Sequence, residues 1–203
     1  MSNKWDERYS EEQFAYGKEP NLFFKEWLSK YPPGSILMPA DGEGRNGVYA
    51  AQLGWAVTAF DQSAEGRSKA LALAKERNVT IEYIVSDLAD LAFEPASFDA
   101  IGLIYAHFDA DKKAGFHKLM DGWLKPGGVI IFEAFSKSHL AYIAADPNIG
   151  GPKDIGMLYA KSELSAGFAN YEVLLLEEQE IELNEGAYHN GKGSVIRFVG
   201  RKK

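Results

Sequence analysis

Residues 34–61 read GSILMPADGEGRNGVYAAQLGWAVTAFD, and this stretch decides the fold. The apolar run at 36–38 predicts a short buried strand, and Gly42 and Gly44 predict a turn directly after it. A helical segment and a second apolar run follow, and that run ends at Asp61. Strand, glycine turn, helix, strand and terminal acid predict a nucleotide-binding βαβ unit, in which backbone N–H groups and a helix N-terminus approach the ligand.

Two classes of ligand fit this unit. Residues 42–47 satisfy the G-x-G-x-x-G pattern of dinucleotide-binding proteins, and Asp61 follows at about the 20-residue distance that this pattern expects. The same unit also serves enzymes that use S-adenosylmethionine (AdoMet), where an acid at the same strand end meets the ribose. The glycine turn by itself leaves both ligands open, and it is also compatible with a simple tight turn.

Composition narrows the class of protein. The chain has 203 residues, of which 46% are hydrophobic, and this length suits one α/β domain spanning 1–203. The formal net charge is −7 and the basic residues are scattered apart from the tail at 201–203, which argues against nucleic-acid binding. Cysteine is absent, so disulfides, thiolate metal sites and cysteine nucleophiles are excluded. The N-terminus lacks a signal-peptide pattern and no segment approaches the roughly 18 apolar residues of a membrane span, so we expect a cytoplasmic protein without membrane contact.

The remaining chain alternates between strand and helix patterns. Helices are predicted from 63 to about 77 and from 111 to 124, and strands at 79–85, 98–104 and 129–135. This alternation predicts a doubly wound, Rossmann-like α/β sheet that is mostly parallel. A loop or partial helix at 136–159 and a short helix at 161–168 follow. The strands at 171–183 and 194–201, joined by a turn-rich connection at 184–193, predict a C-terminal antiparallel strand pair.

The first 33 residues form an N-terminal cover segment in this prediction. Leu22, Phe23, Trp27 and Leu28 follow helical spacing, and the prolines at 32–33 end the helix. The aromatic turn at 14–17 is predicted either to close over a ligand as a lid or to fill the core.

Over almost its full length the chain resembles the class I AdoMet-dependent methyltransferases. The motifs that carry the resemblance are ILMPADGEGRNGVYAAQLG, VTAFDQS, VSDLADL, SFDAIGLI and LKPGGVIIFEAF, of which the turn at 124–128 is the most telling. The WDERY start, the FAYGKEPN turn and the GEGRN loop are similar to the tellurite-resistance (TehB-like) and related small-molecule methyltransferases. The resemblance implies a class I methyltransferase fold and AdoMet as cofactor.

The resemblance also implies the cofactor-binding residues. Asp61 is expected to accept hydrogen bonds from both ribose hydroxyls, with Gln62 beside the adenosine. Asp87 is expected to bind the adenine amino group and Leu88 the ring, while Gly42 and the loop around it meet the methionine part. The full expected set is Tyr16, Gly17, Ala40, Gly42, Gly44, Arg45, Asn46, Asp61, Gln62, Asp87, Leu88 and Tyr105. A helix cap at Asp61, a solvated acid at Asp87, and surface or core positions for Arg45 and Tyr16 are the alternatives.

The first loop departs from the family pattern. Met38 stands where the family usually has an acid, and Ala40 stands where it has a glycine two residues later. Asp41 or Glu43 could substitute for the acid electrostatically. The departure affects the expected cradle for the methionine part of AdoMet and leaves the predicted fold unchanged.

Four histidines are candidates for proton transfer. His107 follows the strand at 98–104 and is the candidate catalytic base, with a hydrogen-bonded loop histidine as the alternative. His117 on a helix and His189 in a polar turn are expected to be structural or exposed, and His139 in the loop at 136–159 could reach a substrate. No pattern of histidine and acidic residues resembles a metal site.

The predicted function is methyl transfer from AdoMet to a small-molecule acceptor, such as tellurite, selenite or a thiol, by in-line displacement. The loop at 136–160 is the predicted substrate-side wall. An AdoMet-binding protein without turnover and a nicotinamide-dependent oxidoreductase are the alternatives. The sequence leaves the acceptor and the oligomeric state undetermined.

Overall fold

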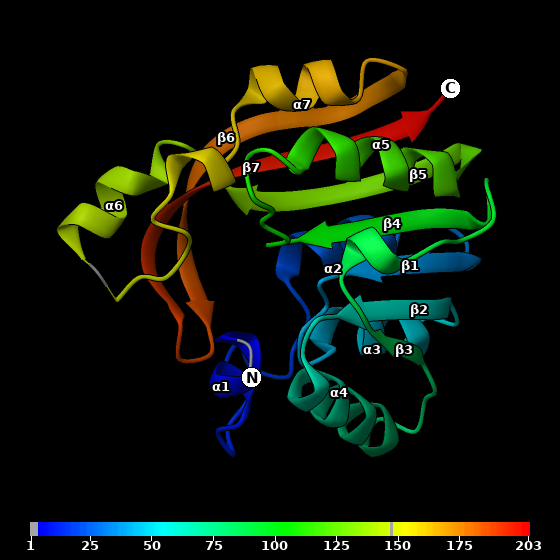
Figure 1. The fold of residues 1–203 in the computed structure, drawn as a ribbon, viewed down its shortest axis with the longest axis horizontal. Helices are drawn as coiled ribbons and strands as arrows, with labels where there is room; N and C mark the ends of the chain where they lie inside the picture. Colours follow the sequence, from blue (N-terminus) through cyan, green and yellow to red (C-terminus); the bar gives the residue numbers. More distant parts are fainter. Residues whose placement is uncertain (1–3, 147) are drawn as a thin grey trace.

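The computed structural model describes residues 4–146 and 148–203. Its centre is a seven-stranded sheet in the order β3-β2-β1-β4-β5-β7-β6 (Figure 1). The strands are β1 (Ser35–Pro39), β2 (Ala56–Asp61), β3 (Glu82–Val85), β4 (Phe98–Ile104), β5 (Leu124–Phe135), β6 (Tyr171–Glu185) and β7 (His189–Lys202). Strands β1 to β5 pair in parallel, whereas β7 pairs antiparallel with both β5 and β6. The predicted sheet, mostly parallel with a C-terminal antiparallel pair, is confirmed.

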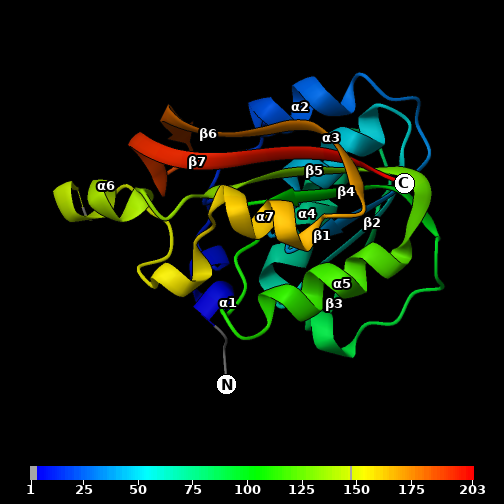
Figure 2. The same cartoon turned by 90° about the horizontal axis from the view of Figure 1, so that it is seen from above.

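Helices cover both faces of the sheet. They are α1 (Lys4–Tyr9), α2 (Leu22–Leu28), α3 (Arg45–Gln52), α4 (Ala64–Glu76), α5 (Lys113–Trp123), α6 (His139–Ala145) and α7 (Lys161–Gly167), with 3-10 turns η1 (Leu88–Asp90) and η2 (Ile155–Met157). Figure 2 shows α2 and α3 on one side of the sheet and α5 and α7 on the other. Within the described ranges, no helix is long and apolar enough to cross a bilayer.

Alternating side chains of the strands build the two core layers. Ile36 and Met38 of β1 pack with α2 and α3 on one face, whereas Leu37 packs with α5 and α7 on the other. All three are at most 1% exposed. Because both faces of the central strands are covered, β1 reads as a continuous apolar run, as expected for a parallel sheet.

The strand order places a topological switch point between β1 and β4. The chain runs outward from β1 to β3 and then crosses back to β4 on the other side of β1. Ligands of open α/β sheets bind at such a point, outside the carboxyl ends of the strands. Ala40 after β1 and Tyr105 after β4 both have left-handed backbone conformations, with φ of +52° and +53°. Non-glycine residues rarely adopt this conformation, and strain of this kind concentrates at functional sites.

The C-terminal strand pair extends further than the sequence pattern predicts. Strand β6 runs to Glu185 and β7 begins at His189, so the turn comprises 186–188 instead of the predicted 184–193. The polar residues at the end of the pair lie in regular register, with Glu185 opposite His189. Helix α1 was not predicted, β3 begins three residues later than expected, and β5 begins at Leu124 with a register shift against β4.

Gly44 is predicted to be indispensable for the packing of α3 on α4. Its φ is +84°, and a Cβ at this position would lie 2.5 Å from the Cβ of Ala70 and 2.9 Å from its Cα. Gly44→Ala should lower the free energy of unfolding by about 2–4 kcal/mol, because left-handed strain adds to overpacking against backbone. Gly115→Ala is the matched control, since no atom lies within 4 Å of its Cβ position in α5. It should stabilise by up to about 1 kcal/mol. Equal urea midpoints for the two variants would contradict this account.

Candidate active site

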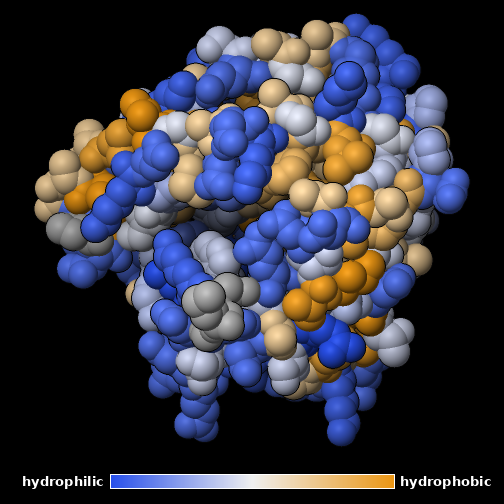
Figure 3. All heavy atoms as spheres, in the orientation of Figure 1, coloured by the Kyte–Doolittle hydropathy of each residue, from blue (hydrophilic) through white to orange (hydrophobic). Residues whose placement is uncertain are grey.

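The carboxyl ends of β1, β2 and β4 surround one region of the surface. The face shown in Figure 3 is hollowed beside the carboxyl ends of β4 and β5. The glycine turn after β1, the start of α3 and the residue after β4 all meet this region through the sheet order. The predicted cofactor residues therefore converge on one edge of the sheet, although they come from distant parts of the sequence.

Asp61 closes β2 beneath the glycine turn. Its carboxylate accepts hydrogen bonds from the backbone N–H of Gly42 at 3.1 Å and of Ser63 at 3.0 Å. The side chain is buried, and burial raises its pKa above the ordinary value, against the backbone hydrogen bonds that lower it. Each carboxylate oxygen carries two lone pairs, so the group retains acceptor capacity for two hydroxyls. The helix after it is capped by Ser63, whose hydroxyl accepts from Gly66 N–H.

The ends of β2 and β3 lie side by side. Gln62 donates from Nε2 to Oδ2 of Asp87 at 3.0 Å. The other oxygen of Asp87 caps η1 by accepting from Ala89 N–H, and Leu88 is buried. These residues place an amide, a carboxylate and an apolar side chain next to Asp61. Such a set can hydrogen-bond the polar edge of a nucleoside base and pack on its ring.

Arg45 and Asn46 are buried at the start of α3, which excludes the surface placement considered for them. Arg45 donates to the carbonyl of Tyr16 at 3.2 Å and pairs with Glu185 at 3.1 Å. The Asn46 Oδ1 atom accepts from the backbone N–H of Asn21 at 2.9 Å. Both side chains therefore hold other segments against the N-terminus of α3.

The unusual residues of the first loop have structural partners. Met38 lies in the core, where its sulfur packs closely on Gly102. Asp41 accepts from Gly47 N–H at 3.1 Å, and Glu43 accepts from Ala15 N–H at 2.8 Å. The two acids near the replaced position are therefore engaged in holding α3 and the N-terminal segment.

The N-terminal segment covers the glycine turn. Tyr9 of α1 lies against Gly42, where an added Cβ would meet its hydroxyl at 2.6 Å. Arg8 donates to the hydroxyl of Tyr16 at 2.8 Å, and the carbonyl of Ala15 accepts from the N–H of Ala187 at the turn between β6 and β7. The predicted aromatic turn thus touches both the first loop and the C-terminal strand pair.

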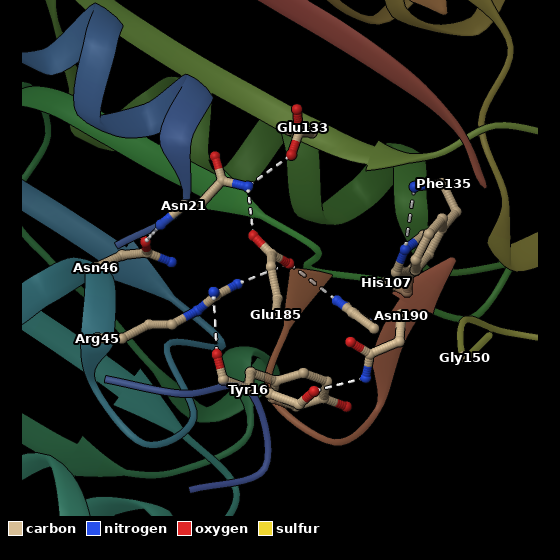
Figure 4. Close-up of polar contacts among 12 residues, drawn as sticks. Tyr16, Asn21, Arg45, Asn46, His107, Glu133, Phe135, Gly150, Glu185 and Asn190 are labelled. Carbon is tan, nitrogen blue, oxygen red and sulfur yellow. Dashed lines mark hydrogen bonds and ion pairs between the residues drawn. The ribbon is translucent and has the colours of Figure 1, made fainter. Parts of the chain in front are cut away.

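A largely buried polar network joins these segments at the half-buried Glu185 (Figure 4). Its carboxylate accepts from Asn21 Nδ2 at 3.0 Å, pairs with Arg45, and lies 3.1 Å from Nδ1 of His189. Burial raises the pKa of Glu185, but the hydrogen bond from His189 and the charge of Arg45 outweigh burial and lower it to about 2. Asn21 Nδ2 also donates to Glu133 at 2.6 Å, so one amide bridges two carboxylates.

A cavity of about 400 Å³ adjoins this network. Residues from the N-terminal segment, α3, the ends of β4 and β5, and the β6–β7 pair line it. Polar and apolar side chains share its wall, among them Asn21, Phe23, Tyr105, Glu133, Leu183 and Arg197. The hydroxyl of Tyr105 is buried and makes no well-formed hydrogen bond to any described residue. A volume of this size and a mixed lining suit a small molecule.

His107 and His139 have both ring nitrogens bound to backbone. His107 donates from Nδ1 to the carbonyl of Met157 at 3.0 Å and accepts at Nε2 from Phe135 N–H at 3.4 Å. Burial lowers its pKa to about 4. His139 donates to Gly150 and accepts from Ser194 N–H. These contacts fix the segment at 136–160 against β5 and β7.

Of the four histidines, His189 contacts the most residues of the cavity wall. The sequence places it in a polar turn, whereas the structure buries it at the first position of β7. Its ring centroid lies 4.6 Å from the rings of both Tyr16 and Tyr105, and 5.1 Å from that of Phe135. His117 instead lies on α5, where its ring stacks on Tyr159 and Phe168.

The sequence analysis missed the roles of Glu133, Glu185 and Asn21. Glu133 gave a signal, because an acid within the apolar run 129–135 is rarely buried without a partner. The partner is Arg197 on β7, which donates to it from Nε. Glu185 gave none, since it ends an acidic strand and its two neighbours in sequence, Asn184 and Gly186, are exposed.

Comparison with known proteins agrees with this geometry. Residues 37–132 match a family model described as a methyltransferase domain. No curated protein sequence matches the chain. The structure solved for the conversion of a disulfide bond into a thioacetal group during echinomycin biosynthesis is 18% identical. Its TM-score is 0.77, and the alignment covers 98% of this chain and 91% of that one.

Two further solved structures are similar. TehB from Haemophilus influenzae has a TM-score of 0.71 at 18% identity, covering 98% of this chain and 66% of that one. A SAM-dependent methyltransferase from Methanosarcina mazei has a TM-score of 0.65 at 17% identity, covering 91% and 98%. At these identities the likeness shows the fold, which is that of the class I methyltransferases.

Glu185 is predicted to make stability depend on pH. Its pKa of about 2 lies below the ordinary value of 4.5, so its contribution is complete above pH 4.5 and is lost as the pH falls toward 2. The shift corresponds to about 3 kcal/mol. Glu185→Gln should therefore cost most of that amount at pH 6 in urea unfolding, and progressively less toward pH 3. Glu182→Gln, at an exposed position on the same strand, is the control. A cost that is independent of pH would refute the prediction.

Proposed function

We propose that the protein transfers a methyl group from AdoMet to a small-molecule acceptor, because residues 37–132 match a family model described as a methyltransferase domain. The observation that carries the proposal is the placement of Asp61 beneath the Gly42 turn, at the edge of the sheet beside the switch point. A carboxylate with spare acceptor capacity at this place suits a ribose with two free hydroxyls. The buried hydroxyl of Tyr105, which makes no well-formed hydrogen bond to any described residue, adds a polar group that a ligand could satisfy.

The chain offers partners for each part of AdoMet. Asp61 would hold the ribose, with Gln62, Asp87 and Leu88 around the adenine. The loop from Ala40 to Gly44, the start of α3 at Arg45 and Asn46, and the backbone of Tyr105 would surround the methionine part. Tyr16 and Gly17 would close over it from the N-terminal segment. AdoMet supplies a methyl group on a positively charged sulfur, which is already a strong electrophile.

The protein's own contribution is alignment and exclusion of water. The N-terminal segment and the tip of the β6–β7 pair meet over the site, through Ala15 and Ala187. The segment at 136–160 supports the tip from the other side, because Gly150 packs so closely on Tyr188 that a Cβ would lie 2.1 Å from its carbonyl oxygen. His107 would position this segment, since both its ring nitrogens are used there. A closed, aligned site supplies much of the acceleration of such a displacement.

The cavity defines the acceptor side. It reaches Tyr105 and Arg45, two of the residues proposed for the cofactor, and extends from there along Phe23 and the β6–β7 pair. Its volume of about 400 Å³ favours a small molecule over a polymer. Tellurite, selenite and small thiols are the first acceptors to screen.

Calorimetric titration tests the cofactor assignment. S-adenosylhomocysteine (AdoHcy) and AdoMet should bind with micromolar affinity, and NADH should not bind. Asp61→Asn should weaken AdoHcy binding by about 10- to 100-fold, because hydrogen bonds to a charged carboxylate contribute about 1.5–3 kcal/mol. Asp90→Asn, at an exposed carboxylate of η1, should bind as the wild type does. Binding of NADH alone, or full affinity in Asp61→Asn, would refute the assignment.

A further inference from the structure

His189 lies where three covering segments converge. Its ring packs between Tyr16 of the N-terminal segment and Tyr105 after β4, and Gly150 of the segment at 136–160 would touch the ring through a Cβ at 3.0 Å. Tyr16, Tyr105 and Glu185, all in contact with the ring, line the cavity. The ring therefore lies directly behind three residues of the cavity wall, one of which is Tyr105 at the switch point.

Glu185 fixes the tautomer of the His189 ring. The carboxylate accepts the proton of Nδ1, so the neutral ring carries its free lone pair at Nε2. Nε2 makes no hydrogen bond to any residue in the described ranges. Burial lowers the pKa of His189, which keeps the ring neutral at pH 7. An oriented, neutral imidazole with a free Nε2 can accept a proton.

The charges around the cavity argue against an oxyanion as acceptor. Three cationic side chains line it, and each is paired with a carboxylate: Lys18 with Glu76, Arg45 with Glu185, and Arg197 with Glu133. The Lys18–Glu76 pair is exposed, so the argument rests on the two arginines. At Arg45 or Arg197 an oxyanion would have to displace Glu185 or Glu133, which would leave that carboxylate unpaired in the interior. A neutral acceptor meets no such cost.

We propose that His189, oriented by Glu185, is the catalytic base of this site and that the acceptor is a neutral molecule with an ionisable hydrogen, such as a thiol, and not tellurite or selenite. This inference rests on the proposed function and narrows its acceptor class. The acceptor's proton passes to Nε2 of His189, and its electron pair forms the bond to the methyl carbon. The pair of the broken carbon–sulfur bond stays on sulfur, and the positive charge of the sulfonium reappears on the imidazolium, which loses its proton to water.

Several titratable groups surround the ring and act on its protonation. Glu185 on β6 favours the protonated form, whereas Arg45 on α3 and Arg8 on α1 oppose it. Tyr16 and Tyr105 stay neutral, because burial raises the pKa of both hydroxyls. His107 and His139 are held neutral by burial as well.

Histidine nitrogen NMR tests the proposal without an acceptor. At pH 7 the ring of His189 should show a protonated Nδ1 and an unprotonated Nε2, and its signals should shift when AdoHcy is added to saturation. The signals of His117, in the core between α5 and α7, should not shift. A protonated Nε2, or a His189 signal that AdoHcy leaves unmoved, overturns the proposal. Absence of AdoHcy binding in calorimetry overturns the proposed function and this inference with it.

Kinetics with two acceptors provide the second test. Wild-type protein should methylate 2-mercaptoethanol and not selenite. His189→Asn keeps an amide donor for Glu185 but lacks the base, so it should bind AdoHcy normally and lose about 10²- to 10³-fold in rate at pH 7. The loss should disappear above the pKa of the thiol, where the acceptor is already ionised. Faster transfer to selenite, or a wild-type rate for His189→Asn at pH 7, overturns the proposal. If neither acceptor is methylated, the assignment of His189 as the base is decided by the NMR result.

Discussion

The pairing of the half-buried carboxylate of Glu185 is the interaction on which the arrangement of this site depends. An ionised group in the interior must be paired and hydrogen-bonded, and its partners come from three elements. Asn21 precedes α2, Arg45 begins α3, and His189 begins β7. Satisfying one charge therefore fixes the tip of the C-terminal strand pair against the N-terminal segment and the first helix of the βαβ unit. The β6–β7 pair continues past the last residue of β7 that pairs with β5, and this extension brings Glu185 and His189 to the contact.

The contact between the tip of the β6–β7 pair and the N-terminal segment adds a cavity to the fold. The glycine turn and Asp61 belong to the edge of the sheet for which we propose nucleoside binding. The β6–β7 pair adds the wall that such an edge lacks, and with it a cavity that reaches Tyr105. Tyr105 follows β4 directly at the switch point, with a left-handed backbone and a buried hydroxyl. Rigid elements thus hold the groups that would face both cofactor and acceptor.

The sequence predicted the features that depend on local pattern. Strand β1, the turn at Gly42, Asp61 and the antiparallel pair all follow from residues close together in the chain. It did not predict what depends on distant partners: Asn21 meets Glu185 across 164 positions, and its bond to Glu133 spans 112. The polar residues 184–193 read as a turn, since nothing local shows that the N-terminal segment covers Glu185 and His189. The buried strand at 36–38 was predicted, but the close packing of Met38 on Gly102 of β4 was not, because that contact joins distant parts of the chain.

A crystal structure of the protein with AdoHcy tests the central claim most directly. The account predicts both ribose hydroxyls on the carboxylate of Asp61, adenine beside Gln62 and Leu88, and the sulfur atom facing Tyr105 and the ring of His189. The contact between Glu185 and Arg45 should persist in the complex. AdoHcy bound elsewhere, or bound at Asp61 with the tip of the β6–β7 pair displaced and His189 away from the sulfur, would contradict the account.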